Sequence, residues 1–244
     1  PPPLADSSFD WSTTGTQGEK NWFNGYYNLT QDADAEYAVE DFIPFDNLAG
    51  PGGGPVAPDG NHWTGTQWDL IGSGAPWTYV GQNGTHPNGT NSGDEHWSVR
   101  RWVADGLTGK TALELTWKMA KANLAGDGVS GRLFVNGEEV DSATIGGNNG
   151  QGVTRQYYIN AEPGDVIDLA LTPVGLTNTA DGSDGSVNQL TVSTDLGEGP
   201  WFNPGDILAD SIADFAPDVQ GQDNWFYGYY DQRLDVEEGD AVYG

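Results

Sequence analysis

The sequence "TALELTWKMAK" at residues 111–121 alternates large apolar side chains with polar or small ones from Leu113 to Ala120. The apolar members occupy every second position: Leu113, Leu115, Trp117 and Met119. Successive side chains of a strand point to opposite faces, so this period of two predicts a β-strand with one face on a hydrophobic core.

Further strand patterns follow it along the chain. In "GRLFVNGEEVDSATI" at 131–145, Asn136-Gly137 separates two apolar runs; both positions of a type I′ turn need positive φ, so this pair predicts a β-hairpin. "VTRQYYINAEPGDVIDLALTP" at 153–173 is typical of strand, turn and strand, and "NQLTVST" at 188–194 predicts a last strand. No stretch shows a convincing helical period, so we expect an all-β protein, an antiparallel β-sandwich or jelly roll with little helix.

A motif near the N-terminus recurs near the end of the chain. "QGEKNWFNGYYN" at 17–28 returns as "QGQDNWFYGYYDQ" at 220–232. A repeat so far along the chain suggests the opening of a second domain rather than a solenoid. We therefore predict the end of a linker at 1–4, a β-sandwich domain at 5–200, and a linker with the incomplete start of a second repeat at 201–244.

The chain is strongly acidic, with 36 Asp and Glu residues against 9 Lys and Arg and a formal net charge of −27. Such a charge repels nucleic acid and anionic lipid, so neither is an expected partner. There is no cysteine to form a disulfide. No apolar stretch reaches the length of about 18 residues that insertion into a membrane requires.

The tryptophan-rich half of the chain resembles a known type of module. The motifs "HWTGTQWDL" (62–70), "PWTYVGQNGTHPNG" (76–89), "HWSVRRW" (96–102) and "GDGVSGRLFVNGEEV" (126–140) follow one another. This order is similar to that of a jelly-roll module of secreted bacterial proteins, often large multidomain ones associated with polysaccharides. The resemblance implies a β-sandwich of the carbohydrate-binding-module type and an extracellular or cell-surface location.

Aromatic rings that stack on the apolar faces of sugars are the expected binding groups. Within "EHWSVRRW" at 95–102, alternation puts His96, Arg100 and Trp102 on one face of a strand, a plausible sugar platform. The alternative for each tryptophan is a place in the core. The candidate ligand-binding residues are Trp63, Trp68, Trp77, His86, His96, Arg100 and Trp102.

Acidic, glycine-containing loops indicate a possible structural calcium ion, because calcium takes six to eight oxygen ligands. The segments are "DADAE", "GDG" and "DGSDG", and the alternative is a solvated acidic surface. The candidate ligands are Asp32, Asp34, Asp127, Asp181 and Asp184. Zinc is not expected, since the chain lacks cysteine and its three histidines are not closely paired.

Two other classes of function remain open at this point. Small polysaccharide lyases also use jelly rolls, and glycoside hydrolases need paired carboxylates, but the sequence contains few motifs typical of catalysis. A structural or adhesive repeat unit of an extracellular stalk or filament would suit the acidic composition and the repeated motif, with neighbouring copies of the protein as partners. A non-catalytic polysaccharide-binding module of a multidomain secreted protein is the leading hypothesis.

Overall fold

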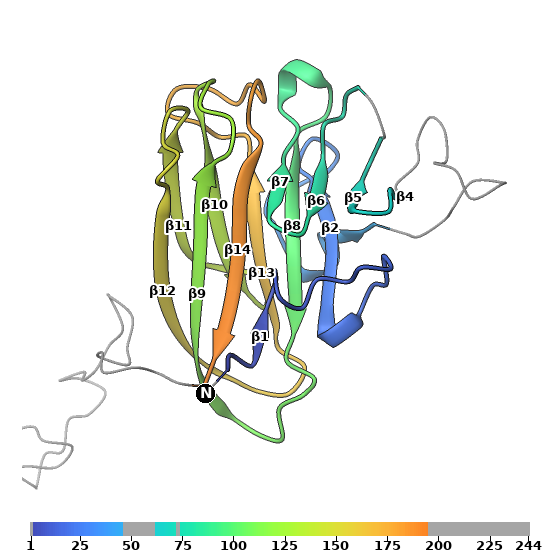
Figure 1. The fold of residues 1–244 in the computed structure, drawn as a ribbon, viewed down its shortest axis with the longest axis vertical. Coiled ribbons are helices and arrows are strands. Elements are labelled where there is room, and N and C mark those ends of the chain that lie inside the picture. Colours follow the sequence, from blue (N-terminus) through green and yellow to red (C-terminus); the bar gives the residue numbers. More distant parts are fainter. Residues whose placement is uncertain (1, 46–61, 72–73, 195–244) are drawn as a thin grey trace, which may run out of the picture. The chain divides into compact units, whose positions relative to one another are not determined.

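The chain forms a β-sandwich of two antiparallel sheets in the computed structural model, which describes residues 2–45, 62–71 and 74–194 (Figure 1). One sheet has the order β12-β9-β14-β7-β6-β5-β4, and β1 pairs with β14 beside this path. The other has the order β11-β10-β13-β8-β2-β3. The predicted fold class is therefore confirmed.

The strands are β1 (Ala5–Asp6), β2 (Trp22–Asn28), β3 (Ile43–Pro44), β4 (His62–Trp63), β5 (Gln67–Asp69), β6 (Tyr79–Gly81), β7 (Gly84–His86), β8 (His96–Val103), β9 (Thr111–Lys121), β10 (Gly128–Val135), β11 (Glu138–Gly146), β12 (Val153–Ala161), β13 (Val166–Thr172) and β14 (Ser186–Ser193). The helical elements in the described part of the chain are three short 3-10 turns: η1 (Glu19–Asn21), η2 (Val39–Asp41) and η3 (Thr90–Ser92). None of the helices in those residues is long and apolar enough to cross a membrane.

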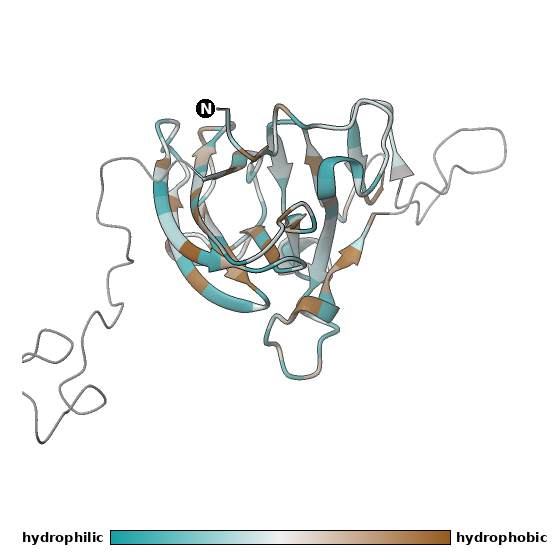
Figure 2. Ribbon diagram, turned by 90° about the horizontal axis from the view of Figure 1, so that it is seen from below, coloured by the Kyte–Doolittle hydropathy of each residue, from teal (hydrophilic) through white to brown (hydrophobic). Residues whose placement is uncertain are grey.

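The strand at 111–121 is β9, and its four alternating apolar side chains are fully buried between the sheets. They pack with apolar residues of β10, β13 and β14 in the main hydrophobic core. Figure 2 shows hydrophobic and hydrophilic positions alternating along the strands of the two layers. Burial of one face of each strand is the main stabilising contribution to such a sandwich.

The predicted hairpin is also present and joins β10 to β11. Asn136 and Gly137 have φ values of 51° and 85°, as a type I′ turn requires. The turn at Pro163-Gly164-Asp165 does not form a hairpin, because it connects β12 at the edge of one sheet to β13 inside the other. The chain therefore crosses between the layers at this turn.

Residues 29–42 cover the outer face of the six-stranded sheet. Tyr37 packs there on Trp97 and Phe134 in a second, smaller apolar cluster. Beneath this segment, Arg101 forms a bidentate ion pair with the buried Asp168 at 2.7 and 2.8 Å. The Tyr37 hydroxyl also donates to Asp168 at 2.7 Å, so the covering segment is fixed by hydrogen bonds as well as by apolar packing.

The predicted second repeat at 201–244 lies outside the described residues. The boundary near residue 200 therefore stays a prediction. All the strands above lie between Ala5 and Ser193, within the predicted domain.

Candidate functional site

Strand β8 alternates as expected, but its predicted sugar platform points into the sandwich. His96, Arg100 and Trp102 are 5%, 1% and 2% exposed. Trp102 belongs to the main core. The opposite face of β8 lies under residues 29–42, so β8 presents neither face as a platform, and the three side chains predicted to bind ligand are packed inside the sandwich.

Arg100 is a buried structural cation. Its guanidinium donates to the carbonyl oxygens of Asn188 at 2.8 Å and Gly81 at 2.5 Å, and more weakly to that of Gln82 at 3.3 Å. These acceptors lie on β14 and on the end of β6, so Arg100 ties the two sheets together. Burial lowers the pKa of its guanidinium to about 9.

His96 also has a structural environment. Its Nδ1 atom lies 3.0 Å from the hydroxyl of Thr78, and its ring packs on Tyr26 with a centroid distance of 5.0 Å. Burial lowers the pKa of His96 to about 4, and the charge of Asp94 opposes this shift. The imidazole is therefore neutral at physiological pH.

Trp68 and Trp63 form part of a third apolar cluster. Trp68, another predicted ligand-binding residue, is completely buried and packs with Phe45 and Val80. Trp63 is half-buried, with its ring 5.3 Å from that of Trp68 and 5.9 Å from that of Trp11. These rings support the short strands β4 and β5 from inside.

The outward row on β5, β6 and β7 brings polar and aromatic groups together. The register pairs Asp69 with Tyr79 and Tyr79 with His86 across the three strands. The alternate row, Trp68, Val80 and Thr85, is fully buried. Because cross-strand neighbours share a face, Asp69, Tyr79 and His86 form one contiguous surface.

This surface is the floor of a cavity of about 200 Å³. Its described lining residues are Gln67, Asp69, Ile71, Gly74, Trp77, Tyr79 and His86. The structure thus brings together two of the predicted ligand-binding residues, Trp77 and His86. We call this cavity the β5–β7 pocket; its volume lies below the range of about 300–1,000 Å³ typical of small-molecule sites.

Trp77 is an exposed large aromatic at the pocket, 47% accessible to solvent. Its backbone N–H donates to the side-chain oxygen of Asn88 at 2.8 Å. Asn88 is itself buried and donates to the carbonyl of Asp94 at 2.7 Å. The loop that carries the exposed ring is therefore held in place before any ligand binds.

The polar groups of the pocket have defined protonation states. The Nδ1 atom of His86 lies 2.5 Å from the carbonyl oxygen of Pro87, which can only accept, so Nδ1 carries the proton. Burial lowers the pKa of His86, which leaves Nε2 as an acceptor at neutral pH. Burial, followed by the charge of Asp69, raises the pKa of Tyr79, so its hydroxyl stays a donor.

Sequence reasoning missed Gln67, Asp69 and Tyr79. The signal was the alternation in "QWD", where the inward Trp68 separates the outward Gln67 and Asp69, and in "TYV", where the outward Tyr79 lies between the buried Thr78 and Val80. Each strand has only three residues. A period of two is hard to recognise over so short a length.

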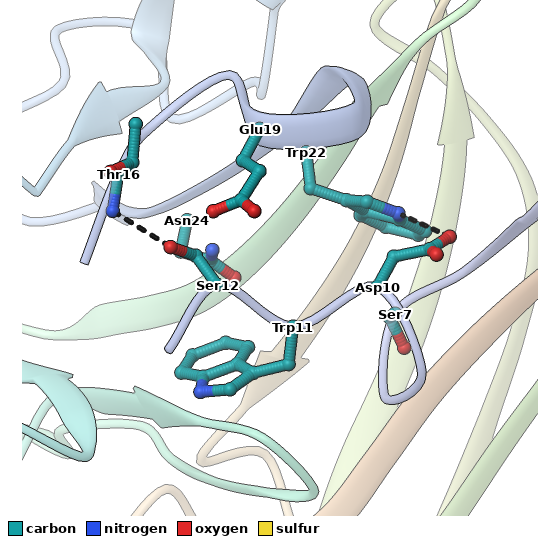
Figure 3. A pocket seen from close by; sticks show the side chains of 8 residues that line it. All are labelled: Ser7, Asp10, Trp11, Ser12, Thr16, Glu19, Trp22 and Asn24. Carbon is teal, nitrogen blue, oxygen red and sulfur yellow. Dashed lines mark hydrogen bonds between the residues drawn. The ribbon is translucent and has the colours of Figure 1, made fainter. Parts of the chain in front are cut away.

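Two other cavities fit a sugar less well. The one in Figure 3, lined by Trp11, Trp22 and polar neighbours, has a volume of only about 10 Å³. Two hydrogen bonds join residues of its lining, from Thr16 N–H to Ser12 and from the Trp22 indole to Asp10. A larger groove of about 290 Å³ is acidic, and its described lining has a single aromatic residue, the buried Tyr27.

The carboxylates predicted to bind calcium are engaged by donors of the protein. Asp127 accepts from the backbone N–H groups of Thr177 and Asn178, and Asp32 accepts from Tyr27. Asp34 accepts from the N–H of Glu36. Each of these carboxylates therefore uses part of its accepting capacity within the protein.

In the "DGSDG" loop, Asp181 accepts from the Gly89 N–H, and the buried Lys121 ammonium lies 3.3 Å from Asp184. Burial raises the pKa of Asp184 to about 7, and Lys121 opposes this shift. Nowhere in residues 2–45, 62–71 and 74–194 do three or more acidic or histidine side chains form a group that could hold a metal ion. Calcium binding stays a prediction, tested by whether EDTA lowers and calcium restores the midpoint of thermal unfolding.

Comparison with known proteins gives similarity to carbohydrate-binding modules. No protein-family model matches the sequence, and no curated protein matches it. A family 35 module from Clostridium thermocellum is 17% identical, with a TM-score of 0.28 over 39% of this chain and 69% of the module. A family 51 module from Clostridium perfringens, solved with methyl-galactose, is 16% identical, with a TM-score of 0.30 over 52% and 79%. A family 35 module from Paenibacillus barcinonensis is 15% identical, with a TM-score of 0.28 over 52% and 91%. Similarity of this size assigns no function to any residue of this chain.

Proposed function

We propose that this chain is a non-catalytic, extracellular carbohydrate-binding module whose ligand occupies the β5–β7 pocket. The observation that carries the proposal is the exposed ring of Trp77 beside an outward row of polar side chains on a rigid sheet. A pyranose ring has an apolar face and a rim of hydroxyl groups. The indole suits the face, and Tyr79, His86 and Gln67 suit the hydroxyls.

The pocket supports binding rather than hydrolysis. Of its described lining residues, Asp69 alone is a carboxylic acid. Retaining and inverting glycosidases both need two carboxyl groups flanking the bond to be cleaved. The pocket therefore has the groups for recognition without the acid and base pair for this chemistry.

The experiment compares Trp77→Ala with Phe9→Ala in a glycan array and in calorimetric titration of the glycans that bind. Phe9 is 85% exposed and does not line the pocket, so it controls for loss of any surface aromatic. Stacking and the burial of the ring together should make the Trp77 variant bind at least about tenfold more weakly. Removal of an exposed side chain should leave the free energy of unfolding within about 0.5 kcal/mol of wild type.

Equal glycan affinity of the wild type and the Trp77 variant would show that the β5–β7 pocket is not the sugar-binding site. A large loss of stability in that variant would instead place Trp77 in the structural core. Binding to no glycan at all would favour the structural or adhesive role suggested by the repeated motif.

A further inference from the structure

A lysine and an aspartate meet in the interior at one end of the sandwich. Lys121 is the last residue of β9, Asp184 lies just before β14, and both side chains are fully buried. The register pairs Lys121 with Ser186 of β14, so the backbone brings the two side chains close together. The Lys121 ammonium donates to Asp184 Oδ1 at 3.3 Å and to the carbonyl oxygen of Ser183 at 2.6 Å. The fold therefore holds the lysine nitrogen beside the carboxyl group.

The two charges satisfy each other only in part. The second carboxylate oxygen of Asp184, Oδ2, is buried and accepts no hydrogen bond from any residue that the structure describes. A buried carboxylate oxygen without a donor is costly and rare in folded proteins. The contact at Oδ1 is longer than the distance of about 2.7–2.9 Å typical of a hydrogen bond between charged groups. Burial of both charges also costs desolvation, which favours their neutral forms, an amine and a carboxylic acid.

The surrounding backbone fixes both groups and covers them. The Ser186 hydroxyl donates to the main-chain carbonyl oxygen of Asp184 at 2.8 Å, and the Lys121 N–H donates to that of Asn149 at 3.0 Å. A side-chain carbon at Gly126 would lie 3.7 Å from Asp184 Oδ1, so the loop after β9 packs against the carboxyl group. Groups held in contact in this way react as if at effective concentrations of up to about 10⁵–10⁸ M.

We propose that the side chains of Lys121 and Asp184 condense to an amide, which is a covalent cross-link between β9 and the segment that leads into β14. One proton passes from the ammonium to Oδ1, the resulting amine attacks Cγ of Asp184, and a second proton passes to Oδ1, which leaves as water. The Nζ–Cγ bond forms, the Cγ–Oδ1 bond breaks, and no oxidant or reductant is consumed. The proton that stays on the nitrogen remains a donor for the Ser183 carbonyl.

The product suits its surroundings better than the ion pair does. It buries one neutral amide in place of two charges. It also joins residues 63 positions apart in a chain that has no cysteine for a disulfide. Like a disulfide, such a cross-link restricts the unfolded chain and so stabilises the folded one.

The test is the intact mass of the whole folded chain, measured after purification and again after prolonged incubation. We expect a mass lower than that of the sequence by one water molecule. Proteolysis and tandem mass spectrometry should then give a branched peptide that contains both Lys121 and Asp184. Asp184-Gly185 can also lose water by closing to a cyclic imide, so the sample is treated with alkaline hydroxylamine, which opens an imide and leaves an amide intact.

Two variants assign the lost water to the lysine. Lys121→Met should have the full mass of its sequence, whereas Lys118→Met, which changes an exposed lysine of the same strand, should still lose one water. If Lys121→Met does not fold, the branched peptide of the wild type decides the question.

The full mass in folded wild type after incubation would overturn the proposal. A loss of water that hydroxylamine reverses, or that persists in Lys121→Met, would overturn it in favour of the imide. Neither result depends on whether the chain binds a sugar.

Discussion

Replacement of Arg100 by methionine tests whether this residue is structural or binds ligand. Methionine keeps much of the aliphatic volume but cannot donate hydrogen bonds. The change therefore leaves the carbonyl oxygens of Asn188 and Gly81 without their partner in the interior. The guanidinium of Arg100 also lies over the ring of Trp11, with 5.6 Å between its carbon atom and the ring centroid, and this contact is lost.

The magnitude follows from the two short hydrogen bonds. Each buried acceptor left unpaired costs about 1–3 kcal/mol, so the two together cost about 2–6 kcal/mol. Arg100→Met also removes a buried charge, so the folded variant no longer has the desolvation penalty of the guanidinium, and this offsets part of the lost stability. We expect a net loss of about 3 kcal/mol, a large part of the 5–15 kcal/mol typical of a folded domain.

Urea denaturation measures this loss as a change in the transition midpoint at constant slope. Arg155→Met is the matched control, because Arg155 makes an ion pair with Asp141 but its side chain is 47% exposed. Exposed ion pairs contribute at most about 1 kcal/mol, so this variant should be close to wild type. If Arg100→Met were as stable as Arg155→Met and had lost glycan binding, Arg100 would be a ligand-binding residue as the sequence suggested, and the structural reasoning would be refuted.

Three further predictions concern the same sandwich. The folded state holds His96 neutral with a pKa of about 4, so protons bind preferentially to the unfolded chain below pH 6.5, and the free energy of unfolding should fall as the pH drops from about 6.5 to 4. In His96→Gln this loss should be smaller by about 2–3 kcal/mol. Parallel pH profiles of the unfolding free energy for wild type and variant would contradict the reasoning. Gly137→Ala should cost about 1–2 kcal/mol in urea denaturation because the φ of Gly137 is positive. Gly109→Ala should be nearly neutral, because a Cβ added at Gly109 would meet no heavy atom within 4 Å. Equal effects of the two substitutions would exclude backbone strain as the cause. Deletion of residues 205–244 should leave the sandwich folded and change its self-association in analytical ultracentrifugation, and failure of the shortened chain to fold would show that the segment is an integral part of the domain.

The class of fold could be predicted from the sequence because its signals are local. The alternation at 111–121 needs only the geometry of a strand, and it correctly identified Leu113, Leu115, Trp117 and Met119 as buried. It missed that Ala120 and Lys121 at the end of β9 are buried as well. Asn136-Gly137 likewise determines its own turn, because both residues tolerate positive φ. Neither inference depends on what the rest of the chain does.

The candidate site depended on tertiary structure. Alternation divided the side chains of β8 into two sets, but it could not say that Trp102 and Arg100 face the opposite sheet or that residues 29–42 cover the other face. The β5–β7 pocket arises from the register between three-residue strands, which places Asp69 beside Tyr79. The sequence alone therefore determined that this protein is a β-sandwich rich in tryptophan. Tertiary packing decided which tryptophan rings are buried and which stay exposed, because the burial of a ring depends on the strands and loops that pack against it.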